Sequence, residues 1–103
     1  MDRVALLNQV LEQNPTDAFA RYGLAMAYIS EGKASEALNQ FNTLIGHNPD
    51  YVPGYQMSAQ TLAKLGRVQE AISRLRSGLD AAQRTGNQHA AAEMQGLLDE
   101  LGG

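Results

Sequence analysis

The side chains in this sequence that could perform chemistry are two histidines and one adjacent pair of carboxylates. His47 and His89 lie 42 residues apart, and neither has a partner at the spacing that a metal site or a general base requires. Asp99 and Glu100 come just before Leu101, where a solvated helix end is expected. The sequence therefore predicts no catalytic residues, no metal ligands and no enzyme.

The glycines and the cysteine count exclude further kinds of chemistry. A terminal Gly102-Gly103 could be a conjugation tail, but it directly follows a helical pattern, so we expect a helix C-cap and a flexible tail. The other glycines form no phosphate-binding loop after a strand, so no nucleotide or other cofactor is expected. The absence of cysteine excludes disulfides, thiolate metal sites and cysteine nucleophiles.

Composition and charge are those of one small globular domain. The 103 residues are 44% hydrophobic and 18% charged, which is enough apolar surface for a core. The formal charge of -3 is spread along the chain, which argues against nucleic acid or an anionic membrane as a partner. Neither a signal-peptide pattern at the start nor a run of about 20 apolar residues is present, so a cytoplasmic protein is the default expectation.

The strongest pattern is an internal repeat of 34 residues. The recurring pairs are Asn14-Pro15 with Asn48-Pro49, Ala25 with Ala59, Gly32 with Gly66, and Glu36-Ala37 with Glu70-Ala71. Three apolar positions recur three times, as Val4, Leu38 and Ile72, as Leu7, Phe41 and Leu75, and as Leu11, Ile45 and Leu79. Within each copy their spacing is three and then four residues, which places them on one face of a helix.

Helix-breaking residues divide each repeat into two helices. Gly32 interrupts the helical pattern, Pro15 follows the end of a helix, and Thr16 and Asp50 stand where helix N-caps are wanted. The predicted helices cover residues 3–13, 17–31, 34–46, 51–65, 68–84 and 88–101. They give a half repeat at 3–15, full repeats at 16–49 and 50–84, and a capping helix at 87–101. Stacking of neighbouring helix pairs is the expected way to form a continuous core.

The first full repeat resembles the tetratricopeptide repeat. The matching residues are Leu24-Ala25, Tyr28, Gly32, Ala37, Phe41 and Pro49, and the second copy offers Ala59, Leu62, Gly66, Ala71 and Leu75. In the second copy, Ser58 and Gly78 stand where the first copy has Leu24 and Leu44. Gln83 stands where a proline is expected. The resemblance covers residues 3 to about 84, and the last helix matches only as an amphipathic cap. It implies an all-α fold, a right-handed helical-repeat stack of about six antiparallel helices (an α-α superhelix), as a single domain over residues 1–103.

The helix predicted at 17–31 is apolar on two faces. Leu24, Ala25 and Tyr28 match the positions at which the family packs its helices, whereas the second stripe is unexplained by packing against one side. In tetratricopeptide proteins the equivalent positions line a concave groove that holds a partner's peptide or helix. The resemblance therefore implies a groove formed by Phe19, Tyr22, Met26, Ile29, Gln56, Met57, Gln60 and Lys64.

The predicted groove is apolar at one end and polar at the other. Several family members grip carboxylate tails with lysines and asparagines, and at those positions this chain has Tyr22, Met26, Met57 and Gln60, so no carboxylate clamp is expected. Three interpretations of the apolar stripe stay open: an end helix covers it, two copies of the chain bury it, or it binds another protein. The predicted function is a non-catalytic adaptor for a peptide or amphipathic helix. The alternative is a self-associating scaffold, a homodimer formed through the stripe or the capping helix.

Overall fold

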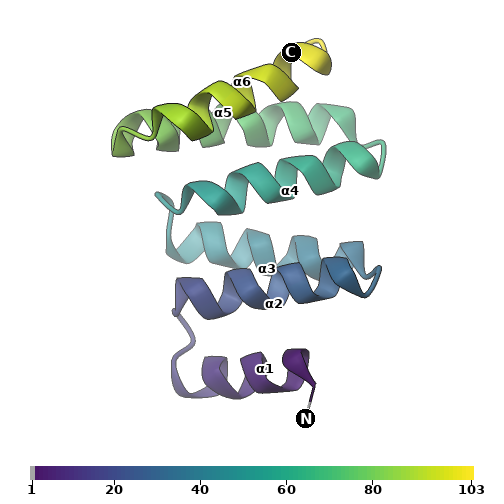
Figure 1. The fold of residues 1–103 in the computed structure, drawn as a ribbon, viewed down its shortest axis with the longest axis vertical. Helices are drawn as coiled ribbons and strands as arrows, with labels where there is room; N and C mark the ends of the chain where they lie inside the picture. The colour runs from purple at the N-terminus through teal and green to yellow at the C-terminus, as the bar shows by residue number, and fades with distance from the viewer. Residues whose placement is uncertain (1) are drawn as a thin grey trace. The chain divides into compact units, whose positions relative to one another are not determined.

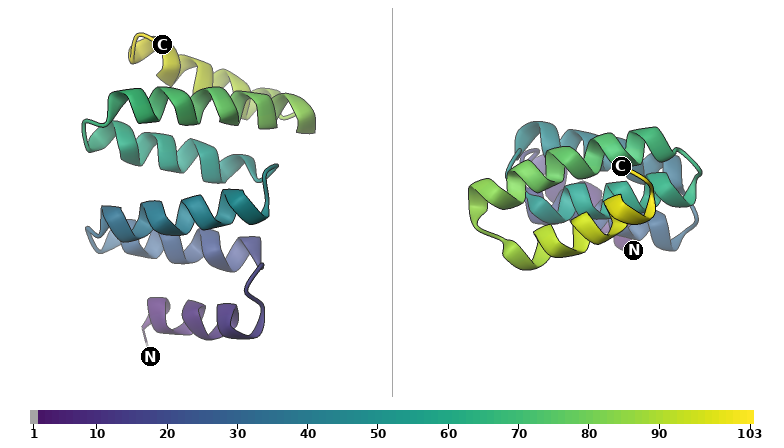
Figure 2. Two further views of the ribbon diagram at one scale, coloured as in Figure 1. Left: turned by 180° about the vertical axis from the view of Figure 1, so that it is seen from behind. Right: turned by 90° about the horizontal axis from the view of Figure 1, so that it is seen from above.

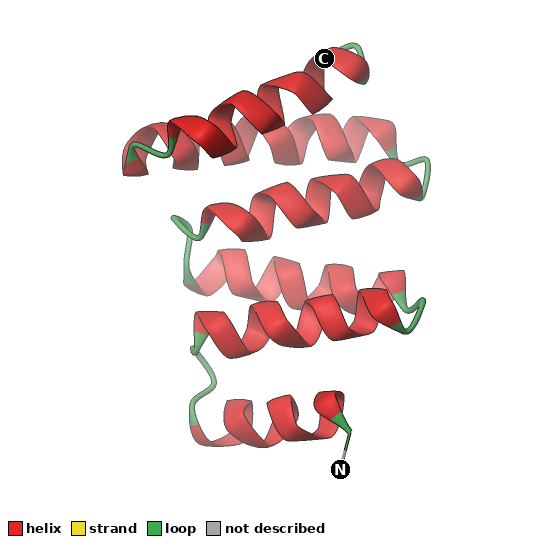
Figure 3. Ribbon diagram, in the orientation of Figure 1, coloured by secondary structure: helices red, strands yellow, loops and turns green. Residues whose placement is uncertain are grey.

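The computed structural model describes residues 2–103, which form six α-helices and no strand (Figure 1, Figure 3). The helices are α1 (Arg3–Gln13), α2 (Ala18–Ser30), α3 (Ala34–His47), α4 (Val52–Lys64), α5 (Val68–Thr85) and α6 (Gln88–Glu100). All six predicted helices are confirmed, and each predicted end lies within one residue of the observed end. None of the described helices is long and apolar enough to cross a membrane.

The chain divides into two compact units at the junction between the two full repeats. The N-terminal unit ends at Asn48 and contains α1, α2 and α3, and the C-terminal unit runs from Pro49 to Gly103 and contains α4, α5 and α6. The single-domain organisation of residues 1–103, with its repeat boundaries, stays a prediction.

In the N-terminal unit, α2 packs against both α1 and α3. Its contact with α1 is a hydrophobic cluster formed by Leu11, Ala20 and Leu24, with Val4, Leu7 and Tyr28 packed around it. On the side of α3, the Arg21 guanidinium donates to Gln40 Oε1 at 2.7 Å and to the Pro15 carbonyl at 2.8 Å. Leu24 and Tyr28, which belong to the predicted packing face of α2, therefore lie in contacts between helices.

In the C-terminal unit, α5 packs against both α4 and α6, and it leads into α6 through the turn at Gly86 (Figure 2). The helix is 18 residues long because Gln83 stands where the first repeat has a proline. Ser58 of α4 is fully buried, and its hydroxyl donates to the Gly54 carbonyl at 2.7 Å and accepts from Arg74 Nη1 at 3.1 Å. The serine that replaces Leu24 of the first repeat thus has its hydrogen bonds satisfied.

The two predicted N-caps are wrong by one residue. The Asp17 carboxylate, not Thr16, caps α2, because its Oδ1 accepts the Ala20 N–H at 2.9 Å. Asp50 instead accepts from Arg84 Nε at 2.8 Å, and the N-cap position of α4 is Tyr51, which makes no side-chain cap bond. Arg84 is available for this ion pair because α5 continues to Thr85.

Left-handed glycines end four of the helices. Gly32 and Gly66 have φ of 74° and 77°, and the N–H groups that follow them bond to the carbonyls of Tyr28 and Leu62 at 2.9 Å. Gly102 ends α6 in the same way, which confirms the predicted C-cap. The Gly103 N–H donates to the Leu98 carbonyl at 3.0 Å and completes this cap, and the flexibility of the tail stays a prediction.

We expect Gly78→Ala to destabilise the protein by about 1–3 kcal/mol through overpacking. A Cβ at this position would lie 2.7 Å from Met94 Sδ and 2.7 Å from Tyr55 Cβ, and the tyrosine Cβ can move only with its helix. Gly96→Ala is the matched control, because a Cβ there meets no atom within 4 Å and should stabilise α6 by up to about 1 kcal/mol. Urea unfolding followed by circular dichroism measures both changes. Equal stability of the two variants would contradict the packing at Gly78.

We expect Asp17→Ala to lower the free energy of unfolding by about 1 kcal/mol, because α2 loses its side-chain cap. Thr16→Ala should change it by no more than about 0.5 kcal/mol, since the Thr16 side chain is exposed. The same urea titrations measure both variants. A larger loss for Thr16→Ala than for Asp17→Ala would indicate that Thr16 caps α2.

Candidate functional site

The apolar stripe of α2 is exposed at its N-terminal end. Phe19, in the first turn of the helix, is 80% exposed, whereas Tyr22, Met26 and Ile29 are half-buried. The Tyr22 ring packs against the buried Phe41 ring of α3, with 6.2 Å between centroids and planes inclined by 58°. Tyr22 is thus anchored in the core on one side, and Phe19 is the largest uncovered apolar side chain of the helix.

The first helix does not cover Phe19. α1 packs on the face of α2 that carries Ala20, Leu24 and Tyr28, and Leu7 approaches the Gly23 position. The interpretation in which the first helix covers the apolar stripe is therefore not supported, because α1 packs against another face of α2.

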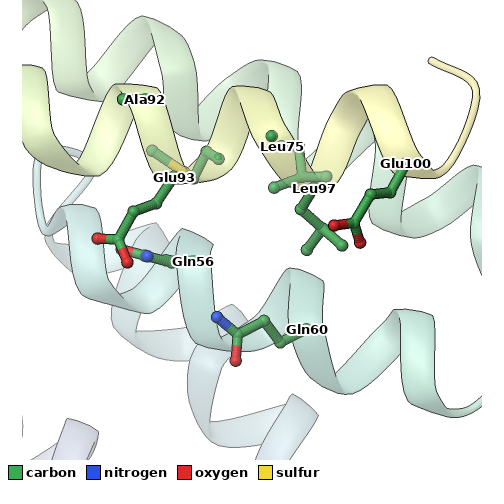
Figure 4. A pocket seen from close by; sticks show the side chains of 9 residues that line it. Gln56, Gln60, Leu75, Ala92, Glu93, Leu97 and Glu100 are labelled. Carbon is green, nitrogen blue, oxygen red and sulfur yellow. The ribbon is translucent and has the colours of Figure 1, made fainter.

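The predicted binding residues of α4 lie in the C-terminal unit, and two of them line a cleft. Gln56 and Gln60, one helical turn apart, face α6 across a cleft of about 340 Å³ (Figure 4). Met57 is half-buried and Lys64 is exposed, and neither lines this cleft. The structure thus brings the two glutamines together with the last helix.

The opposite wall of the cleft comes from α6. Glu93, Leu97 and Glu100 follow one another at spacings of four and three residues, so they share a helical face. Figure 4 shows their side chains on one side and the amides of Gln56 and Gln60 on the other. Buried Leu75 and Met94 contribute the apolar floor, and Ala92 and Gly96 complete the lining.

The role of this wall could not be predicted from the sequence. The last helix was predicted to be an amphipathic cap, with Asp99 and Glu100 at a solvated end, and Ala90, Met94 and Leu98 are its buried residues. The available signal was the four-and-three spacing of Glu93, Leu97 and Glu100 beside that buried face. Only the tertiary structure shows that this second face of α6 meets α4.

The electrostatic character of the cleft is acidic. From Thr85 to the end of the sequence there are three carboxylates and no lysine or arginine. His89 Nε2 lies 3.1 Å from Glu93 Oε1, and Asp99 Oδ1 accepts from Gln95 Nε2 at 2.9 Å. Within the described residues, no ion pair occupies Glu100, so its carboxylate faces the cleft without a cation.

The histidines and carboxylates of residues 2–103 are dispersed over several helices. His47 and His89 are both exposed and stand on different helices. Among residues 2–103, no group of three or more His, Cys, Asp or Glu side chains could hold a metal ion. The side-chain hydrogen bond from Arg67 lowers the pKa of Glu70, but this pair is fully exposed and lies outside the cleft.

Comparison with known proteins places this fold in a family. The family model "Tetratricopeptide repeat" matches residues 4–58 and 29–97. A tetratricopeptide repeat domain protein from Salinibacter ruber is 32% identical, with 85% of this chain and 89% of that chain covered and a TM-score of 0.81. The TPR2B domain of yeast Sti1, solved in complex with pHsp70, is 20% identical, with 96% and 79% covered and a TM-score of 0.88.

One curated relative is a much longer protein. The tetratricopeptide repeat and J domain-containing co-chaperone DNJ1 from Cryptococcus neoformans is 32% identical over 87% of this chain, a stretch that makes up 16% of the co-chaperone. The overlapping family matches cover most of this sequence and include all the positions at which the 34-residue pattern recurs in helices α2 to α5. The chain belongs to the tetratricopeptide repeat family.

Proposed function

We propose that this chain is a non-catalytic module that binds a short peptide or helix of another protein. The observation that carries the proposal is Phe19, which is 80% exposed on a helix that buries Ala20, Leu24, Ala25 and Ala27. A large aromatic side chain held on a rigid helix supplies contact area at a small cost in entropy, which is typical of binding hot spots.

The proposed binding residues form one face on each unit. On α2 they are Phe19, Tyr22, Met26 and Ile29, and on α4 they are Gln56, Met57, Gln60 and Lys64. The apolar face anchors a large side chain of the partner, and Met26 adapts its shape to that side chain. The polar face supplies amide groups for hydrogen bonds to the partner. The complex of the Sti1 TPR2B domain with pHsp70 supports this proposal, because a domain of the same fold is there in complex with pHsp70.

A carboxylate tail is not the proposed partner. The positions that would hold its charge carry Tyr22, Met26, Met57 and Gln60, which contribute no positive charge. An apolar or amphipathic segment fits these side chains better than an acidic one.

Self-association through the same stripe is the second candidate function. It is favoured by the number of uncovered apolar side chains in the N-terminal unit, since Leu6 is 50% exposed and Val10 is 44% exposed in addition to Phe19. Short repeat arrays have little core, and a dimer contact adds buried apolar area. The last helix is a weaker contact, because its apolar residues Ala90, Met94 and Leu98 are already buried.

We expect Phe19→Glu to weaken peptide binding at least about tenfold, because it places a charge in an apolar contact. Binders are selected from a random peptide display library, and their affinities are measured by isothermal titration. Leu6→Glu is the matched control, since it makes the same exchange at an exposed apolar position of α1 and should leave binding unchanged. Equal binding by both variants, with matched helicity by circular dichroism, would refute the proposed contact.

Sedimentation equilibrium across a wide concentration range separates the two candidates. The adaptor proposal predicts a monomer at every concentration. A dimer that Phe19→Glu dissociates would instead favour self-association through α2.

A further inference from the structure

We propose that the cleft between α4 and α6 is a subsite for an arginine side chain of the bound segment. This inference rests on the proposed function, and it assigns a chemical class to the partner. The cleft lies entirely within the C-terminal unit and is lined by Gln56 and Gln60 on α4 and by Glu93, Leu97 and Glu100 on α6.

The charge of the cleft selects a cation. Both of its charged lining residues are carboxylates, Glu93 and Glu100. Glu100 stands in the last turn of α6, where the helix dipole adds partial negative charge to that of the carboxylate. No lysine or arginine side chain lines the cleft, so an entering cation meets attraction from both carboxylates.

The shape and the polar groups favour arginine over other cations. Half-buried Leu97 and exposed Ala92 offer an apolar surface along which the three methylene groups of an arginine can lie. The planar guanidinium has five N–H donors, which match a carboxylate on one wall and the side-chain amide oxygens of Gln56 and Gln60 on the other. A lysine ammonium satisfies the charge with fewer and less directional bonds.

Two nearby charged groups leave Glu100 as the main anchor. When protonated, His89 pairs with Glu93 at 3.1 Å and competes for that carboxylate. Lys64 lies one helical turn beyond Gln60 and does not line the cleft. Glu100 forms no ion pair with a histidine or a lysine within the described residues.

The test uses three blocked alanine-based helical peptides of twelve residues. Each carries one leucine and, one turn away, an arginine, a neutral citrulline or a glutamate. We expect the arginine peptide to bind roughly tenfold more tightly than the citrulline peptide at low salt, as one charged hydrogen-bonded pair would give. Its addition should shift the NMR signals of the Leu97 and Met94 methyl groups and of the Gln60 side-chain amide.

Two variants of α6 separate a local contact from overall charge. Glu100→Gln should abolish the preference for arginine over citrulline, whereas Asp99→Asn should retain it. Asp99 has the same charge and is the neighbouring residue, but it bonds to Gln95 and does not line the cleft. An equal loss in both variants, or no preference in the parent chain, would overturn the inference.

Failure of this inference is distinguishable from failure of the proposed function. Binding of all three peptides with NMR shifts confined to α2 would refute the arginine subsite and leave the α2 contact standing. The absence of any binding by these peptides would refute the subsite, and the display selection would then decide the proposed function separately.

Discussion

The close approach of two antiparallel helices is the constraint on which both units depend. In the N-terminal unit Ala25 of α2 and Ala37 of α3 have no exposed surface, and Ala59 of α4 and Ala71 of α5 repeat this 34 residues later. Side chains of one methyl group let helix backbones approach closely, and a larger residue would force the helices apart. The left-handed glycines between the helices then fix the turn, so that both alanines of a pair face inward.

Two differences between the repeats account for much of the C-terminal unit. Because Gln83 replaces a proline, α5 continues to Thr85, and Arg84 reaches Asp50. The longer helix also offers α6 a full-length surface, on which Gly78 leaves room for Met94 beside Tyr55. A leucine here, as in the first repeat, would occupy that space and displace α6. The cleft with Gln56 and Gln60 thus depends on a missing proline and a missing side chain.

The sequence predicts the helices well because their signals are local. Periodicity, the breakers Gly32 and Gly66, and the repeat together determine each helix to within one residue. The caps were misplaced because Thr16 and Asp17 are both good cap residues, and the choice depends on which oxygen reaches the Ala20 N–H. The wall formed by Glu93 and Glu100 was missed for a different reason. α5 contacts both α4 and α6, and its packing determines which face of α6 meets α4. The sequence of α6 alone does not indicate that face.

The charged residues of α6 lie on two different parts of its surface. A helix that only shields a core from water carries its charged residues on the face turned away from apolar surface, as Asp99 does with its bond to Gln95. Glu93 and Glu100 instead border a cleft whose floor includes Leu75 and Met94. Both carboxylates are exposed at the edge of the cleft, so they remain hydrated while no partner is bound. A positively charged group that enters the cleft would meet both negative charges beside an apolar side chain, Leu97.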